Sequence, residues 1–173
     1  MLTRRNATFF GAAALISACG NAATTATART EIMNTASANA NLDWANLSKS
    51  EWKDRLTDQE FHVLRKEGTE RPWTSPFNDE KRAGTYVCAG CALPLFKADT
   101  KFDSGTGWPS FFDYIEGAVE TKTDFKMIVP RTEYHCSRCG GHQGHVFKDG
   151  PNPTGLRYCN NGVALDFVPA DQT

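Results

Sequence analysis

One cysteine near the C-terminus is separate from the paired thiols of the chain. Cys159 lies in the segment Gly-Leu-Arg-Tyr-Cys-Asn-Asn-Gly, whereas four other cysteines form two CxxC units. Cysteine attacks electrophiles as the thiolate, which positive and hydrogen-bonding neighbours favour. Arg157 precedes Cys159 by two positions, on the same face if the segment is a strand, and Asn160 and Asn161 follow it. We therefore predict that Cys159 is a nucleophile; the alternative is an inert buried cysteine, the usual state of an isolated thiol.

Two histidines, His142 and His145, lie on a glycine-flanked segment that precedes this cysteine. Imidazole exchanges protons near neutral pH, so either ring could act as an acid or a base beside the thiol. The alternative is that these histidines bind a metal or cap a loop. Four other cysteines already complete a ligand set, so the histidines are surplus as metal ligands.

The two CxxC units are Cys88/Cys91 and Cys136/Cys139. A CxxC turn can direct both sulfurs at one ion, and two such turns complete a tetrahedron. We predict one structural zinc per chain, with no open position for catalysis. The alternative is a pair of disulfides, which an exported chain could form.

The N-terminus has the features of a targeting segment. Arg4 and Arg5 precede a short apolar run, and Ser17-Ala18-Cys19 follows it. This pattern predicts a signal peptide over residues 1–19, of lipoprotein or twin-arginine type, with a lipid on Cys19 in the first case. The chain would then be exported, periplasmic or lipid-anchored at the cell envelope. The alternative is a transit peptide removed in an organelle.

Composition divides the rest of the chain into a tether and one domain. Residues 20–41 are rich in Ala, Thr and Asn without apolar periodicity, which predicts a disordered tether before a domain over 42–169. The net charge of −1 gives no broad attraction to nucleic acid or to an anionic membrane. We expect no nucleic-acid partner, no membrane contact except through Cys19, and a monomer.

The domain begins with two helices and continues as short strands. Ser48 with Glu51 and Thr57 with Glu60 fit capping boxes, which predict helices over 49–55 and 58–67, with Gly68 as the second stop. Later apolar residues alternate in short runs, which predict strands at 85–87, 118–121, 126–129, 133–135, 145–147, 156–158 and 163–167. Without crossover helices these strands must pair antiparallel. The fold class is therefore mainly β, with a small helical N-terminal layer.

Three motifs resemble the signatures of type B methionine sulfoxide reductases. They are Ser-Gly-Thr-Gly-Trp-Pro-Ser-Phe at 104–111, Cys-Gly-Gly-His-Gln-Gly-His-Val-Phe at 139–147 and the segment around Cys159. The resemblance runs from about residue 42 to 169 and includes both CxxC units. It implies two small antiparallel sheets, no organic cofactor, and reduction of the R epimer of methionine sulfoxide, chiefly in proteins.

The resemblance also implies roles for residues. Cys159 would attack the sulfoxide sulfur and become a sulfenic acid, while His142 and His145 would bind and protonate the oxygen. Asn161 would hydrogen-bond within the catalytic site. The implied substrate-binding residues are Trp108, whose ring would stack on the substrate methyl group, Arg157 and Phe147. Oxidised proteins and a thioredoxin-like reductant are the implied partners.

The chain departs from the family pattern at Thr106. Many family members carry a cysteine there that closes a disulfide with the oxidised nucleophile. The remaining thiols except Cys19 are assigned to zinc, so we expect an external thiol to reduce Cys159; the alternative is Cys19 on its tether. Two other functions stay open: a zinc-stapled module that binds a peptide around Trp108, and a reductase of free methionine sulfoxide.

Overall fold

Two antiparallel sheets make up most of the domain. The computed structural model describes residues 42–126 and 129–172, so the predicted signal segment and the whole predicted tether lie outside the described residues. The first sheet has the order β2-β1-β9 and contains β1 (Gly84–Cys88), β2 (Pro94–Lys97) and β9 (Leu165–Pro169). The second has the order β3-β4-β8-β7-β6-β5 and contains β3 (Lys101–Phe102), β4 (Ser110–Phe111), β5 (Val119–Asp124), β6 (Arg131–Cys136), β7 (His142–Phe147) and β8 (Arg157–Asn160). This confirms the prediction of a mainly β fold with antiparallel pairing.

The core between the two sheets is aromatic. Phe96 of β2 and Phe111 of β4 stack with ring centroids 4.2 Å apart, and Tyr86 of β1 meets Phe111 edge-on at 5.0 Å. Tyr134 of β6 and Tyr158 of β8 continue the cluster at 5.3 Å. Offset and edge-on ring pairs of this kind add to the stabilisation from burial alone. Strands β4 and β8 of the second sheet therefore each contribute an aromatic ring to this core.

Two helices form the N-terminal layer, as predicted. In α2 (Lys49–Arg55) and α3 (Asp58–Lys66), both predicted capping boxes are present. The second helix ends one residue earlier than predicted, because Glu67 takes a left-handed conformation before Gly68 is reached. Helix α3 packs on β7 and on the short 3-10 helix η3 (Gly162–Ala164). Over the described residues, no helix has the length and apolarity needed to cross a bilayer.

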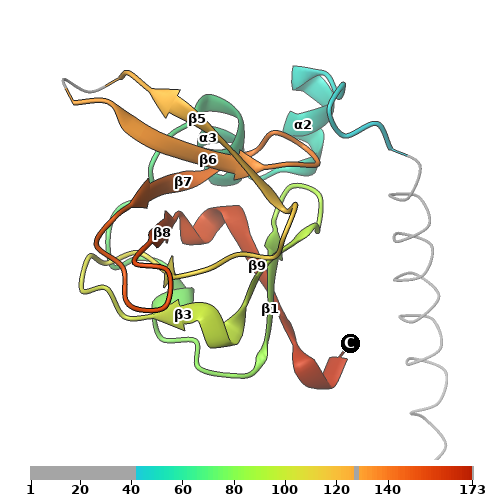
Figure 1. Cartoon of the computed structure of the whole chain (residues 1–173). Helices are drawn as coiled ribbons and strands as arrows, with labels where there is room; N and C mark the ends of the chain where they lie inside the picture. The colour runs from blue at the N-terminus through green and yellow to red at the C-terminus, as the bar shows by residue number, and fades with distance from the viewer. Residues whose placement is uncertain (1–41, 127–128, 173) are drawn as a thin grey trace, which may run out of the picture. The chain divides into compact units, whose positions relative to one another are not determined.

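The strand predictions were wrong at two places and incomplete at others. At the first, Val163 and Ala164, predicted as strand, lie in the 3-10 helix η3. Residues 126 and 129, predicted as strand, lie in the turn between β5 and β6, at the end of a hairpin that projects from the domain (Figure 1). Val129 is exposed there, so the apolar residue did not mark a buried face, and residues 127–128 of the prediction lie outside the described residues. Strands β2, β3 and β4 were not predicted, because runs of two to four residues are too short to show a period.

Candidate active site

A small cavity opens over the middle of the second sheet. Its volume is about 120 Å³, and it is lined by Thr69, Trp108, Arg131, Gly144, His145, Phe147, Cys159, Asn160 and Asn161. Five of these residues, Trp108, His145, Phe147, Cys159 and Asn161, are among the candidate site residues predicted from sequence. Thr69 and Arg131 were not predicted, because they come from the loop after α3 and from the start of β6, far from the motifs. Of the remaining predicted residues, His142 and Arg157 lie outside this lining.

Cys159 lies on β8 between two neighbouring strands. It pairs with Ser110 of β4 on one side and with His145 of β7 on the other. Strand β7 can approach this closely because residue 144 is glycine: a Cβ there would lie 1.9 Å from the carbonyl oxygen of Cys159. Cys159 is half-buried, so it is not the fully buried cysteine of the alternative prediction.

The electrostatic surroundings of Cys159 act in opposite directions. Burial raises the pKa of the thiol, while the positive charge of Arg157 and a hydrogen bond with Thr106 lower it. Burial outweighs the other two, and the pKa is above its ordinary value. The sequence prediction was therefore right that Arg157 favours the thiolate, but Thr106 and not Asn160 or Asn161 supplies the hydrogen bond, and the prediction did not account for the cost of burying a charge.

Arg157 does not line the cavity but contacts residues that surround it. Its Nε and Nη2 each donate to the carboxylate of Asp149, both at 2.9 Å. Its guanidinium also lies over the ring of Phe147, 4.3 Å from the centroid. This side chain is buried, so we interpret it as a fixed positive charge beside Cys159 and as the platform for the Phe147 ring.

A chain of hydroxyl groups runs along the other side of Cys159. Ser104 Oγ lies 2.8 Å from both Thr106 Oγ1 and Ser110 Oγ, and Ser110 donates to the carbonyl oxygen of Trp108. Thr106 is the residue at which relatives of the resembled family often carry cysteine. In this chain the position holds a group that can hydrogen-bond to the thiol but cannot form a disulfide with it.

Both histidines are held by carboxylates. His145 Nε2 lies 2.7 Å from Asp124, and His142 Nδ1 lies 2.6 Å from Glu133. An ionised carboxylate only accepts, so each of these ring nitrogens donates. Burial lowers the pKa of His145 although Asp124 opposes the shift, so this imidazole is neutral at pH 7.

His142 differs from His145 in its exposure. It is buried, its Nε2 has no partner among the described residues, and its ring meets that of His145 edge-on with centroids 5.5 Å apart. His142 lines a second cavity, which shares Thr69, Arg131 and His145 with the first. It is therefore connected to the thiol site through the ring of His145.

The two asparagines after Cys159 are fixed by the scaffold. Asn161 donates through Nδ2 to the carbonyl oxygen of Gln143 at 2.9 Å and accepts at Oδ1 from the backbone N–H of Glu70 at 3.0 Å. Asn160 is fully buried and accepts from the hydroxyl of Tyr134 at 2.5 Å. Both main partners of Asn161 are backbone groups, so the amide shapes the wall of the cavity.

Glu70 connects three parts of the site and was not predicted from sequence. Its carboxylate accepts from the backbone N–H groups of Gly162 and Val163, at 2.5 and 2.9 Å. Its carbonyl oxygen accepts from Trp108 Nε1 at 3.2 Å, and its own N–H donates to Asn161. The residue is buried, which raises its pKa. In the sequence, a glutamate between Thr69 and Arg71 indicates a solvated loop. Only the fold shows that Glu70 is buried and bonded to three segments, an arrangement that we call the Glu70 clamp.

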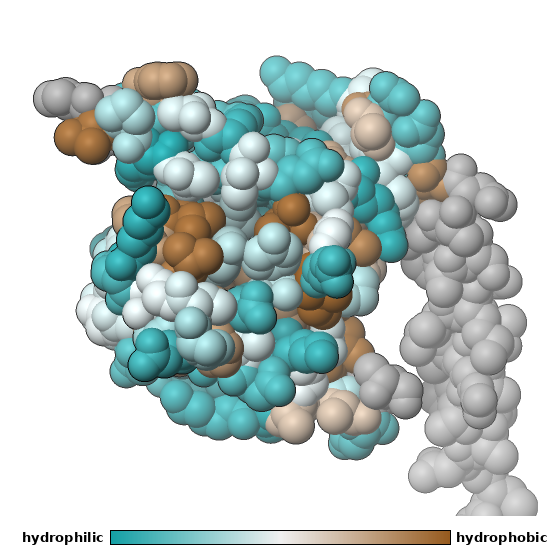
Figure 2. Space-filling model, in the orientation of Figure 1, coloured by the Kyte–Doolittle hydropathy of each residue, from teal (hydrophilic) through white to brown (hydrophobic). Residues whose placement is uncertain are grey.

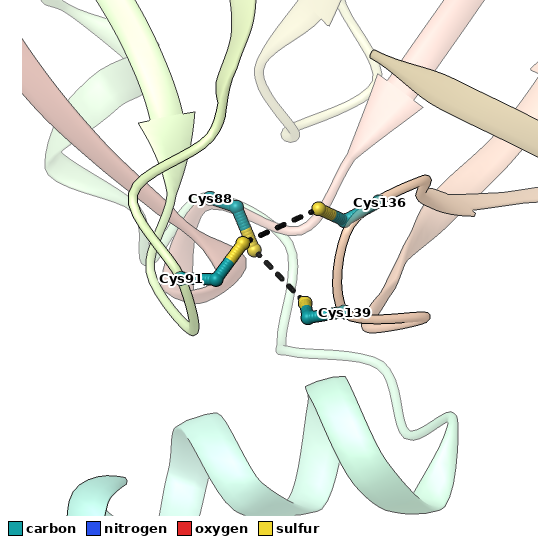
Figure 3. A group of neighbouring side chains, drawn as sticks. All are labelled: Cys88, Cys91, Cys136 and Cys139. Atoms are coloured by element: carbon teal, nitrogen blue, oxygen red, sulfur yellow. Dashed lines mark hydrogen bonds between the residues drawn. The ribbon is translucent and has the colours of Figure 1, made fainter. Parts of the chain in front are cut away.

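The four paired cysteines converge in a separate cluster. Their side chains point toward one another from two loops (Figure 3), and their sulfurs all lie within 4.8 Å of one another. The sulfurs of Cys88 and Cys139 are 3.7 Å apart, and those of Cys91 and Cys136 are 3.5 Å apart. Four thiolates around zinc at about 2.3 Å would be separated by roughly 3.8 Å. The cluster therefore fits a tetrahedral structural metal ion, and all four cysteines are free in the structure.

Polar groups around the cluster suit thiolate ligands. Arg65 of α3 donates to the carbonyl oxygen and the sulfur of Cys139, at 2.9 and 3.2 Å. Gln143 donates to the sulfur of Cys88 at 3.4 Å. Hydrogen bonds from outside the ligand set orient metal ligands. Arg65 also stacks on Trp52, 3.8 Å from the ring centroid, so the helical layer and the cluster are connected.

Comparison with known proteins identifies relatives over most of the domain. The SelR domain model matches residues 56–169. "Peptide methionine sulfoxide reductase MsrB" of Agrobacterium fabrum is 51% identical over 125 residues, which cover 72% of this chain and 93% of that protein. The protein of the same name in Pseudomonas putida is 56% identical over 124 residues, 70% of this chain and 92% of the relative. "Peptide methionine sulfoxide reductase B1, chloroplastic" of Arabidopsis thaliana is 48% identical over 132 residues, 76% of this chain and 65% of the relative.

Loss of one cluster sulfur should empty the metal site. In Cys91→Ser, we expect elemental analysis to find the bound ion reduced from one per chain toward none, and thermal unfolding to lose its sharp transition. The reason is that structural zinc contributes on the order of 10–16 kcal/mol of apparent binding free energy in small domains. Cys159→Ser is the matched control, since it removes a thiol outside the cluster and should keep the ion. A native protein without metal and with all four thiols oxidised would contradict the assignment.

Removing the Glu70 carboxylate should destabilise the domain. In Glu70→Gln, an amide donor faces a backbone N–H, so one buried donor loses its acceptor, and we expect a loss of about 1–3 kcal/mol in urea unfolding. The control is Glu67→Gln, because Glu67 pairs at the surface with Lys122 at 2.7 Å and with Lys126, and exposed pairs contribute roughly 0–1 kcal/mol. Equal losses in the two variants would refute the clamp.

Proposed function

Since the chain belongs to the family of SelR-domain, type B methionine sulfoxide reductases, we propose that it reduces methionine R-sulfoxide in proteins to methionine. Its relatives are named peptide methionine sulfoxide reductases, which supports an oxidoreductase acting on oxidised methionine. We assign the nucleophilic step to Cys159.

The observation that carries this proposal is the composition of the cavity wall. A half-buried thiol shares a small cavity with an indole, a phenyl ring and an imidazole, those of Trp108, Phe147 and His145. A methionine sulfoxide side chain has an apolar methyl end and one strongly polar S–O group. Aromatic faces suit the methyl end, while the guanidinium of Arg131 and an N–H of the imidazole can donate to the oxygen of the polar end. A module that only binds peptides has no need for the nucleophile.

The proposed step balances without an added cofactor. The sulfur of Cys159 attacks the sulfoxide sulfur, the S–O bond breaks, and the oxygen passes to Cys159 as a sulfenic acid while methionine leaves. The substrate sulfur is reduced by two electrons and the cysteine sulfur is oxidised by two. The thiol proton accounts for the proton on the new S–OH group, so solvent supplies none overall.

The histidines would direct this proton during the step. His145 is neutral and donates through Nε2 to Asp124, so its Nδ1 lone pair can accept the thiol proton. His142 already donates through Nδ1 to Glu133, so its Nε2, which has no partner among the described residues, would receive the thiol proton by way of His145 and pass it to the sulfoxide oxygen directly or through water. The raised pKa of Cys159 makes such an acceptor necessary, because the resting form is the thiol.

Zinc is our proposal for the ion in the cluster of four cysteines. Four thiolates in a tetrahedral arrangement are a set that zinc prefers, and a closed set of this kind supports folding and leaves no site for substrate. We also propose that the protein acts as a monomer after export, in the periplasm or on a lipid anchor at Cys19.

The sulfenic acid would be reduced by an external dithiol of the thioredoxin type. One donor thiol attacks the Cys159 sulfur and releases water, and the second donor thiol then releases Cys159 and leaves the donor as a disulfide. Among the described residues, the other cysteines all belong to the cluster. Thr106 cannot take the role of an internal resolving residue.

The proposed reaction is tested with defined sulfoxides. The full chain should convert a blocked methionine R-sulfoxide with dithiothreitol as donor and leave the S epimer essentially unchanged, as followed by chromatography. Cys159→Ser should reduce turnover by at least a thousandfold, because it removes the nucleophile while the zinc cluster and fold stay intact. Turnover of the S epimer alone, or activity retained in Cys159→Ser, would reject the assignment. A comparison of blocked with free methionine sulfoxide separates the peptide enzyme from a reductase of the free amino acid.

The external donor is tested at Cys19, which lies outside the described residues. Cys19→Ser should leave steady-state turnover with thioredoxin or dithiothreitol unchanged within about twofold, because the donor reaches Cys159 directly. Mass spectrometry after one equivalent of sulfoxide, with no donor, should find the added oxygen on Cys159 and no disulfide to Cys19. Collapse of turnover in Cys19→Ser would instead assign the resolving thiol to the tether.

A further inference from the structure

Trp73 is a strained and exposed aromatic residue beside the site. Its side chain is 66% exposed, and its φ of 65° lies in the left-handed region, which bulky residues rarely adopt. Strain of this kind costs on the order of 1–3 kcal/mol and tends to occur at functional positions. No contact described for the catalytic residues requires an indole at this position.

The surrounding loop holds the Trp73 backbone in place. The N–H of Trp73 donates to the carbonyl oxygen of Gly107 at 2.7 Å. Gly107 has φ of 91°, and a Cβ there would lie 2.9 Å from both Pro72 and the indole of Trp73. Asn78 Nδ2 donates to the same carbonyl oxygen at 3.2 Å. The backbone of Trp73 is therefore held against Gly107, the residue that precedes Trp108.

A cavity of about 140 Å³ lies between Trp73 and Trp108. Trp108 also lines the cavity of Cys159, so the two cavities share this residue. The cavity beside Trp73 has charged groups of both signs, including Lys101, Asp79 and Asp103. The cavity beside Trp73 thus adjoins the cavity of Cys159. It has the Trp73 indole as an apolar surface and hydrogen-bond donors and acceptors in its wall.

This combination matches the chemistry of a polypeptide. Backbone amides need both donors and acceptors, which the charged and polar wall provides, and a neighbouring side chain needs an apolar surface, which the indole provides. A free amino acid held at Cys159 would leave this cavity unused. The exposed residues Phe125 and Val129 lie elsewhere, at the end of the β5–β6 hairpin, where Figure 2 also shows apolar surface.

On the premise of the proposed function, we propose that Trp73 and this cavity form a subsite for the polypeptide segment next to the methionine sulfoxide. An aromatic or aliphatic side chain of that segment packs against the Trp73 indole while the sulfoxide lies against Trp108 and Cys159. The subsite selects among oxidised methionines by their neighbours in the sequence.

The experiment compares substrates that differ only in the flanking residue. Values of kcat/KM are measured with dithiothreitol for a blocked methionine R-sulfoxide and for two sets of short peptides, with Phe or with Gly beside the sulfoxide on either side. Because aromatic ring pairs are moderately favourable, the wild-type protein should prefer one Phe peptide to its Gly counterpart by roughly two- to tenfold. Trp73→Gly, which relieves the strained backbone, should remove this preference. Trp73→Phe should restore most of it.

Phe125→Ala is the matched control, since Phe125 is 75% exposed and lines no part of the cavity beside Trp73. It should keep the preference for the Phe peptide. An equal loss in Phe125→Ala would assign the preference to general apolar attraction, and a preference that survives in Trp73→Gly would overturn the subsite. If the wild-type protein fails on the blocked sulfoxide itself, the proposed reaction fails; if only the flanking preference is missing, this inference alone fails.

Discussion

The convergence of four thiols on one point is the constraint on which the rest of the domain depends. Cys88 ends β1 of the first sheet and Cys91 follows it, whereas Cys136 ends β6 of the second sheet and Cys139 lies between β6 and β7. The cluster therefore joins the two sheets at one end. Its effect continues into the site, because β7 carries His142 and His145 and pairs with β8 at the level of Cys159.

The helical N-terminal layer also connects the cluster of four cysteines to the wall of the cavity that contains Cys159. Arg65 attaches α3 to Cys139, and the chain leaving α3 reaches Glu70 within a few residues. There the carboxylate and the backbone of Glu70 bind the segment after Cys159 and the indole of Trp108. The thiol of Cys159 thus lies between two supports that both originate at the cluster, although it has no bond to the cluster itself.

Sequence reasoning succeeded where short-range chemistry decides the structure. The spacing of the CxxC units and the capping boxes at Ser48 and Thr57 depend on neighbouring residues, so they could be predicted. Glu70, Arg131 and Thr69 act through contacts between distant segments, which no local pattern indicates. The raised pKa of Cys159 is a similar case, since the burial that causes it depends on the packing of β4, β7 and the loop of Trp108.

In the proposed reaction, the hydroxyl groups of Thr106, Ser104 and Ser110 would lie beside Cys159 in its oxidised form. They can solvate an oxidised sulfur but cannot reduce it, so its persistence would depend on how often an outside thiol arrives. The rate of repair would then follow the supply of reducing equivalents in the compartment. If the proposed reaction holds, a domain arranged in this way would stall in its oxidised state when that supply falls, and its turnover would follow the redox condition around it.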